Sequence, residues 1–184
     1  MNTFTCDCGD ISYSFEKIFD IPLLFQTDIS NKEVNLNDML EHYFSGGEKI
    51  SWSLACPKCG GKDLERKKKI KLTILPEVII FSLQRFNPVT GVKINKLIQF
   101  EEIIDLKPFC DYDFFNGEIN TKYKLFGISN HSGTINFGHY FSYTKVGENW
   151  YEFNDSFVKQ INLNLMSKAA YFFFYEKIED NGNI

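Results

Sequence analysis

Residues 75–86 read LPEVIIFSLQRF, and this stretch decides the fold. Its middle, residues 78–83, is dense in β-branched and aromatic side chains, which predicts a central strand with both faces covered. Pro88 and Gly91 then predict a turn or loop over residues 87–91. Further strands are expected at residues 123–129, 140–146, 149–154 and 171–175. Short strands joined by turns, such as the tight turn at Gly147 and Glu148, predict a mostly antiparallel sheet.

One amphipathic helix is expected before this region, so the fold class is α+β and mostly antiparallel β. Asn35 or Asn37 can cap the helix, and Gly46 with Gly47 ends it. After residue 61 we expect only strands, and the polar tail 179–184 is expected to fray. The apolar positions of the helix follow the spacing of one helical face: Leu36, Met39, Leu40, Tyr43 and Phe44.

The composition indicates one globular domain with an ample core. The chain has 184 residues, 43% of them hydrophobic, with 19 Phe, 9 Tyr and 2 Trp. A net charge of −4 excludes a sequence-wide basic footprint for nucleic acid. The basic run 66–69 with Lys71 is expected to be a solvated strand edge, or else a patch for an acidic partner. No apolar run suits a signal peptide or a membrane span, so we expect no membrane partner and a cytoplasmic or nuclear location.

Four of the five cysteines form two close pairs, Cys6 with Cys8 and Cys56 with Cys59. Two short pairs next to turn-forming glycines are typical of a tetrahedral zinc site, which takes four soft ligands. A closed four-cysteine site is structural, because no coordination position remains for a substrate. The alternative is four unrelated buried thiols. Cys110 stands apart and is expected to be a packed structural thiol.

The three histidines differ in their surroundings. His42 lies beside the apolar face of the helix, as a surface or boundary residue, and His131 lies in a polar loop after a strand. His139 opens the next strand, directly after a glycine. If that strand forms a hairpin with residues 149–154, Asn154 and Asp155 come level with His139. A carboxylate or amide beside an imidazole can fix its tautomer for catalysis, although a hydrogen-bonded core histidine is the more common outcome.

In chain order, the motifs form a combination that is more specific than any one of them. The two cysteine pairs precede LPEVIIFSLQRF, and then follow YKL at 123–125, NHSG at 130–133, GHY at 138–140, WYEFND at 150–155 and AYFFFY at 170–175. This combination resembles the C-terminal half of the catalytic domain of ubiquitin-specific proteases, which are papain-like cysteine deubiquitinases. The resemblance covers residues 6–176. It implies the palm-and-fingers part of that fold, with zinc-ribbon fingers at about 1–70 and a palm at about 71–178.

The resemblance also assigns roles to single residues. His139 matches the catalytic histidine, Asn154 matches the residue that orients it, and Asp155 is a neighbouring acid that assists or substitutes. The loops 87–95 and 132–137 look like two blocking loops over the ubiquitin tail. Phe137 replaces a glycine that many members carry. The residues implied in ubiquitin binding are Ser132, Phe137, Gly138 and Tyr140.

The family's nucleophile has no counterpart here. It belongs to a Cys box in the thumb, ahead of the first zinc pair, and none of the five cysteines fits that box. We therefore expect a piece of a ubiquitin C-terminal hydrolase that is inactive alone and acts on ubiquitin and ubiquitinated proteins. The alternative is a non-catalytic ubiquitin-binding or scaffold module, although a scaffold has no need of an oriented histidine. A zinc-ribbon interaction protein unrelated to ubiquitin is a third reading, and the later strand motifs disfavour it.

Overall fold

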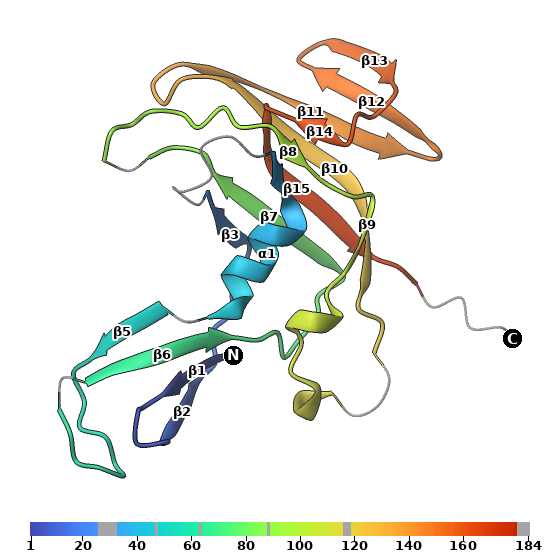
Figure 1. The fold of residues 1–184 in the computed structure, drawn as a ribbon. Coiled ribbons are helices and arrows are strands. Elements are labelled where there is room, and N and C mark those ends of the chain that lie inside the picture. The colour runs from blue at the N-terminus through green and yellow to red at the C-terminus, as the bar shows by residue number, and fades with distance from the viewer. Residues whose placement is uncertain (26–32, 47, 63, 88, 116–118, 180–184) are drawn as a thin grey trace, which may run out of the picture.

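The computed structural model describes residues 1–25, 33–46, 48–62, 64–87, 89–115 and 119–179. Within these ranges no helix has the length and apolar character that a membrane crossing requires. The described elements form three sheets around one α-helix (Figure 1). In chain order they are β1 (Asn2–Thr5), β2 (Ile11–Ser14), β3 (Ile21–Leu24), β4 (Val34–Asn35), α1 (Leu36–Ser45), β5 (Glu48–Trp52), β6 (Leu64–Ile70), β7 (Val78–Gln84), β8 (Ile98–Gln99), β9 (Ile103–Asp105), two 3₁₀ helices (Lys107–Phe109 and Tyr112–Phe114), β10 (Lys122–Gly133), β11 (Gly138–Val146), β12 (Asn149–Asn154), β13 (Phe157–Ile161), β14 (Met166–Ser167) and β15 (Ala170–Lys177).

The largest sheet has eight strands, seven of them in the order β13-β12-β11-β10-β15-β7-β3, with β9 paired to β10. The α+β class, the predicted strands and the turn at Gly147 are confirmed. The pairing is antiparallel except at the edge, where β3 runs parallel to β7. A parallel pair needs a long crossover, and the segment with β4, α1, β5 and β6 supplies it between β3 and β7. The two 3₁₀ helices at residues 107–114 correct the expectation of strands alone after residue 61.

The strand β7 is central, as its composition predicts, because β15 and β3 flank it. Phe81 and Leu83 are fully buried in the core beneath it. From β15, the ring of Tyr175 meets Phe81 edge-on at 5.6 Å between centroids, and Phe173 packs on Phe100 at 4.8 Å. These four rings are therefore part of the interior on which the strands pack.

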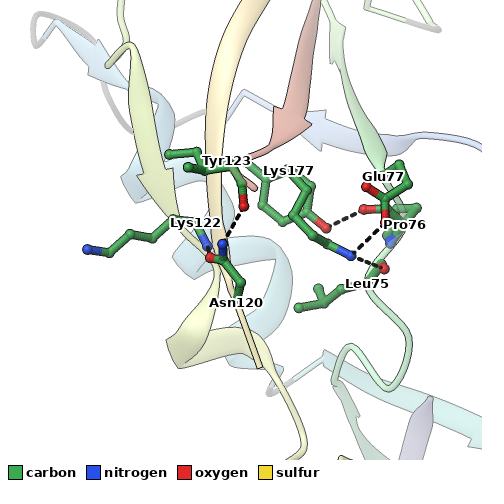
Figure 2. Close-up of polar contacts among 8 residues, drawn as sticks. Leu75, Pro76, Glu77, Asn120, Lys122, Tyr123 and Lys177 are labelled. Atoms are coloured by element: carbon green, nitrogen blue, oxygen red, sulfur yellow. Dashed lines mark hydrogen bonds and ion pairs between the residues drawn. The ribbon is translucent and has the colours of Figure 1, made fainter. Parts of the chain in front are cut away.

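The residues before β7 are held by two neighbouring strands, as Figure 2 shows. The Tyr123 hydroxyl of β10 donates to the Pro76 carbonyl at 2.6 Å. The Lys177 ammonium of β15 donates to the Leu75 carbonyl at 2.8 Å and approaches the Glu77 carboxylate at 3.3 Å. Burial raises the pKa of Tyr123, so its hydroxyl stays protonated as a donor. These contacts fix where β7 enters the sheet.

The helix α1 packs its apolar face on the same core. Of the two candidate caps it uses Asn35, whose side chain accepts from the Asn37 N–H at 2.7 Å. The helix ends at Gly46, where φ is +67° and any side chain would collide with the Lys68 backbone of β6. The buried positions are the predicted ones apart from Tyr43, which is partly buried: Leu36, Met39, Leu40 and Phe44.

The four-stranded sheet has the order β2-β1-β6-β5 and projects away from the eight-stranded sheet (Figure 1). The prediction of a solvated strand edge at residues 66–69 is wrong, because β6 lies between β1 and β5. Strand alternation turns Arg66 inward and leaves Lys67 and Lys69 exposed. Arg66 is only 1% exposed, pairs with the Asp10 carboxylate at 3.4 Å and donates to the Ser12 hydroxyl at 2.8 Å.

Candidate active site and metal centre

Four cysteine side chains meet at one end of the four-stranded sheet. Cys6 and Cys8 follow β1, whereas Cys56 and Cys59 lie between β5 and β6. All four sulfur atoms lie within 4.8 Å of one another, and the Cys8 and Cys56 sulfurs are 3.6 Å apart. The structure therefore brings together the four residues that the sequence predicts as ligands, from two segments about fifty positions apart.

Tight turns at two glycines shape this cluster. The Gly9 N–H donates to the Cys6 carbonyl and the Gly60 N–H to the Cys56 carbonyl, each at 2.8 Å. Both glycines have a left-handed φ, +83° and +70°, which other residues adopt at a penalty. Hydrogen bonds from the backbone N–H groups of Cys59 and Lys58 lower the pKa of Cys56 to about 7. At Cys56 the turn therefore favours the thiolate, the form that binds metal.

The donor set fits zinc. Tetrahedral zinc with Zn–S bonds of about 2.3 Å holds its four sulfurs roughly 3.8 Å apart, close to the spacing seen here. The ion pair of the buried Arg66 with Asp10 lies next to the cluster and supports it. The Asp10 carboxylate also lies 3.5 Å from the Cys56 sulfur. With four cysteines the site has no vacant position, so a bound ion would serve structure rather than catalysis.

The fifth cysteine, Cys110, is packed as expected. It is 4% exposed, and its thiol donates to the Leu106 carbonyl at 3.3 Å. Burial raises the pKa of Cys110 to about 11, so the thiol stays protonated and unreactive.

The predicted catalytic histidine lies at the tip of the β10–β11 hairpin. In the ladder His139 pairs with Ser132, and Gly138 pairs with Gly133. The connecting loop is only residues 134–137, shorter than the predicted loop 132–137, because β10 continues through Gly133. Gly133 has φ +120°, and a side chain there would collide with the Phe137 carbonyl. The glycine therefore lets the hairpin close tightly in front of His139.

Two side chains, Asn154 and Glu152, support the His139 imidazole through consecutive hydrogen bonds. His139 Nε2 lies 2.6 Å from Asn154 Oδ1, and Asn154 Nδ2 donates to the Glu152 carboxylate at 3.3 Å. The carboxylate fixes the amide orientation, because only the NH₂ group of Asn154 can donate to it. Asn154 Oδ1 is then the acceptor, and His139 carries its hydrogen on Nε2. The Nδ1 lone pair is left to accept a proton, which is what a general base needs.

Asp155 occupies a weaker position beside these hydrogen bonds. It lies in the β12–β13 turn with a left-handed φ of +51°, and its carboxylate is 3.9 Å from His139 Nε2. Its side chain is 77% exposed, so water screens the pair strongly. The structure thus brings all three predicted catalytic residues together, with Asn154 in direct contact and Asp155 further out.

The residues implied in ubiquitin binding surround His139 and face solvent. Ser132 lies across the ladder from His139, and Gly138 precedes it. Phe137 is 83% exposed at the hairpin tip, and Tyr140 is 56% exposed. These positions form an open surface next to the imidazole.

The other predicted loop, residues 87–95, makes a turn shortly after the end of β7. The Asn87 side chain accepts from the Val89 and Thr90 N–H groups, which confirms the turn, while Pro88 lies outside the described residues. The buried guanidinium of Arg85 donates to three carbonyls, those of Ala170, Ile94 and Lys96. Burial lowers the pKa of Arg85 to about 10. Arg85 therefore ties the loop to the strand β15.

The sequence interpretation missed three residues near the site. His131 was expected in a polar loop, but it is 4% exposed within β10, because that strand is longer than predicted. Lys93 contacts it from the loop 87–95. Glu152 could have been found from strand alternation, since it stands two positions before Asn154 on the same face. No local sequence signal pairs Lys93 with His131.

These features define an α+β domain that combines a four-cysteine cluster with a supported, exposed histidine. The family model described as ubiquitin carboxyl-terminal hydrolase matches residues 10–175. A relative named probable ubiquitin carboxyl-terminal hydrolase R319, from Acanthamoeba polyphaga mimivirus, is 32% identical over 91% of this chain and 37% of its own length. Ubiquitin carboxyl-terminal hydrolase 21 of Arabidopsis thaliana is 32% identical over 94% of this chain and 23% of its own length.

The chain belongs to the ubiquitin carboxyl-terminal hydrolase family, although it spans well under half the length of these curated relatives. Solved structures agree with the fold. The Ubp8/Sgf11/Sus1/Sgf73 DUB module of SAGA bound to ubiquitin aldehyde matches with a TM-score of 0.79 and 25% identity, over 98% of this chain and 41% of that chain. The same module bound to monoubiquitin matches with a TM-score of 0.77 and 26% identity, over 98% and 40% of the two chains.

Proposed function

We propose that the protein is a thiol-dependent ubiquitin C-terminal hydrolase in which residues 1–184 provide the histidine side of the active centre. The observation that carries this proposal is the chain from Glu152 through Asn154 to His139, which leaves the imidazole Nδ1 ready to accept a proton. Family membership and neighbours solved with ubiquitin support ubiquitin as the substrate.

The proposed reaction proceeds in two stages. A cysteine thiol gives its proton to His139 Nδ1, and the thiolate attacks the carbonyl carbon of ubiquitin's C-terminal glycine. The bond to the amine breaks as His139 returns the proton to the departing amine, which leaves a thioester. Water then gives a proton to His139 and attacks the thioester, and the protonated histidine restores the thiol. Asn154 holds the ring through both stages, with Asp155 as a secondary partner.

The nucleophile in this proposal comes from outside residues 1–184. Four of the chain's cysteines form the metal cluster, and Cys110 is buried against Leu106. The described residues include all five cysteines. None of these five sulfur atoms lies within hydrogen-bond reach of His139. We therefore propose that the 184-residue chain is inactive by itself.

The rest of the chain would bind ubiquitin. We propose that the fingers (about 1–70) carry a structural zinc on Cys6, Cys8, Cys56 and Cys59. We propose that the palm (about 71–178) holds the His139 site. Within the range 1–70, β3 and α1 pack with the palm core. The extended tail of ubiquitin would lie between the loops 87–95 and 134–137, in contact with Ser132, Phe137, Gly138 and Tyr140. Five free thiols fit the reducing environment of the cytoplasm or nucleus.

The direct test is hydrolysis of ubiquitin-7-amido-4-methylcoumarin by the gene product that carries these residues, expressed at its full translated length. We expect His139→Ala to reduce kcat by at least about 100-fold, in the range of general-base removal. The matched control is His42→Ala, which changes an exposed histidine of α1 and should leave kcat unchanged. Asn154→Ala should reduce kcat less, and Asn154→Asp should retain most of it.

Two further outcomes decide between readings. The 184-residue chain alone should release no coumarin, and turnover by it would disprove the external nucleophile. If the full product binds ubiquitin but its weak turnover is the same with and without His139→Ala, the protein is a ubiquitin-binding scaffold and the proposal is wrong.

A further inference from the structure

A lysine from the loop 87–95 reaches the buried histidine of β10. Lys93 Nζ lies 3.0 Å from His131 Nδ1 and donates to the His131 carbonyl at 2.6 Å. The backbone of the lysine is itself fixed, because Phe86 and Lys93 form a β-bridge and the Ile94 N–H donates to the Arg85 carbonyl at 2.6 Å. An ammonium group only donates, so Nδ1 of His131 is an acceptor and the neutral ring carries its hydrogen on Nε2.

The opposite edge of the His131 ring lies against Gly138. A Cβ added at Gly138 would be 2.8 Å from Cε1 and 2.9 Å from Cδ2 of His131, and closer still to Nε2. The φ of Gly138 is outside the left-handed region, so the backbone would accept a side chain and the ring alone forbids one. Since Gly138 directly precedes His139, the His131 ring lies against the residue at which the backbone of His139 begins.

The surroundings of His131 make this arrangement rigid. Its ring contacts Tyr140 at 4.7 Å and both Phe86 and Tyr171 at 5.8 Å between centroids. The backbone N–H of His131 donates to the Ala169 carbonyl at 2.8 Å. The only charged group that the described contacts place on the ring is the Lys93 ammonium.

We propose that Lys93 is a positioning residue for His139: its ammonium group fixes the His131 ring, and that ring sets the position of Gly138. The inference rests on the proposed function, because positioning matters only if His139 is the base. In this proposal the loop 87–95 has a second role besides contact with a ubiquitin tail, because a shift of the loop would move the His139 imidazole.

Nitrogen-15 NMR of the His131 ring tests this directly in the 184-residue chain. In the wild type, the shifts should show the Nε2–H tautomer. Lys93→Met keeps the length of the side chain but removes the donor, so the tautomer should become mixed and the Gly138 and His139 amide signals should shift. Burial and the Lys93 charge lower the pKa of His131, so its titration should also move to higher pH in this variant.

Matched variants complete the experiment. Lys168→Met changes an exposed lysine close to β15 and should alter none of these signals. Lys93→Arg keeps a cationic donor and should retain the Nε2–H tautomer. If Lys93→Met leaves the His131 tautomer and the Gly138 and His139 signals like those of Lys168→Met, the inference is wrong.

Kinetics of the full translated product separate this inference from the proposed function. Lys93→Met should lower kcat about 10-fold with KM changed less than about 2-fold, as expected for a misplaced base rather than weaker binding. An unchanged kcat would overturn the positioning role. A hydrolysis that does not depend on His139 would instead overturn the proposed function, and the NMR result on Lys93 would still report the contact itself.

Discussion

The cysteine cluster and the His139 hairpin are both shaped by glycines, but only the cluster is assembled from locally folded halves. Each cysteine turn is local, since Gly9 and Gly60 donate to carbonyls three and four positions earlier. The His139 site depends on partners from separate strands and loops, namely Asn154 at 15 positions and, for His131, Lys93 at 38 positions. Each half of the first site is therefore encoded in a short motif, and the pairing of β1 with β6 joins the two halves across 48 positions. The second site has no such local half, because its partners come from separate strands and a loop.

This difference predicts how each site fails. Loss of the proposed zinc should release the four-stranded sheet and leave the eight-stranded sheet folded, because the two sheets have separate strand ladders. Damage to the His139 site should instead affect the large sheet, because its supports come from β10, β12 and the loop 87–95. The predictions below test that contrast, beginning with the largest expected effect.

Removal of the proposed zinc should have the largest effect. Zinc sites of this kind contribute on the order of 10 kcal/mol of binding free energy in small peptides. Cys56→Ser should therefore abolish stoichiometric zinc and broaden the NMR signals of β1, β2, β5 and β6, while β7 and β15 keep theirs. Metal analysis and a ¹⁵N spectrum give the readout. Cys110→Ala is the control and should retain one zinc per chain; equal loss of signals from both sheets would contradict the contrast.

Arg85→Met should be the most destabilising single change in the large sheet. The substitution leaves the carbonyls of Ala170, Ile94 and Lys96 without their buried donor, so we expect a loss of about 3 kcal/mol or more in the free energy of unfolding, measured by urea denaturation. Lys159→Met, on the exposed face of β13, should change it by less than about 0.5 kcal/mol. Similar losses in both variants would show that Arg85 does not anchor the loop.

Gly138→Ala should come next, at about 1–3 kcal/mol, because the new methyl group overlaps the His131 ring. Gly127→Ala in the same sheet is the matched control, since its Cβ would meet Phe174 at an ordinary 3.6 Å. Combined with His131→Ala, the Gly138 change should cost less than it does alone. Strict additivity in that double-mutant cycle would mean that the ring is not the obstacle.

The same contrast explains what the sequence could and could not predict. The cysteine ligands, the helix cap at Asn35 and the central strand all follow from local patterns, and the structure has them. The basic run was misread because alternation does not show whether a strand lies at an edge, and Asp10, the partner of the buried Arg66, lies 56 positions away. His131 was misread because the end of β10 depends on its pairing with β11 rather than on its own residues.

The smallest expected effect is the pH dependence contributed by His131. Burial and Lys93 lower its pKa below the ordinary 6.5, so the unfolded chain binds the proton first and stability is lost as the pH falls through 6.5. The slope is at most about 1.4 kcal/mol per pH unit for one such group. The groups that face the ring are the Lys93 ammonium and the neutral rings of Phe86, Tyr140 and Tyr171, so no carboxylate among the described contacts offsets the loss.

Urea midpoints measured between pH 7.5 and 5.0 isolate this contribution as the difference between the wild type and His131→Gln. The wild type should lose more stability towards low pH than the variant, whereas His42→Gln should follow the wild type. Lys93→Met should reduce the difference, because removal of the ammonium brings the pKa of His131 closer to that of the unfolded chain. Parallel curves for the wild type and His131→Gln would show that the imidazole gains its proton without disturbing the contact, and the site would then be held by packing alone.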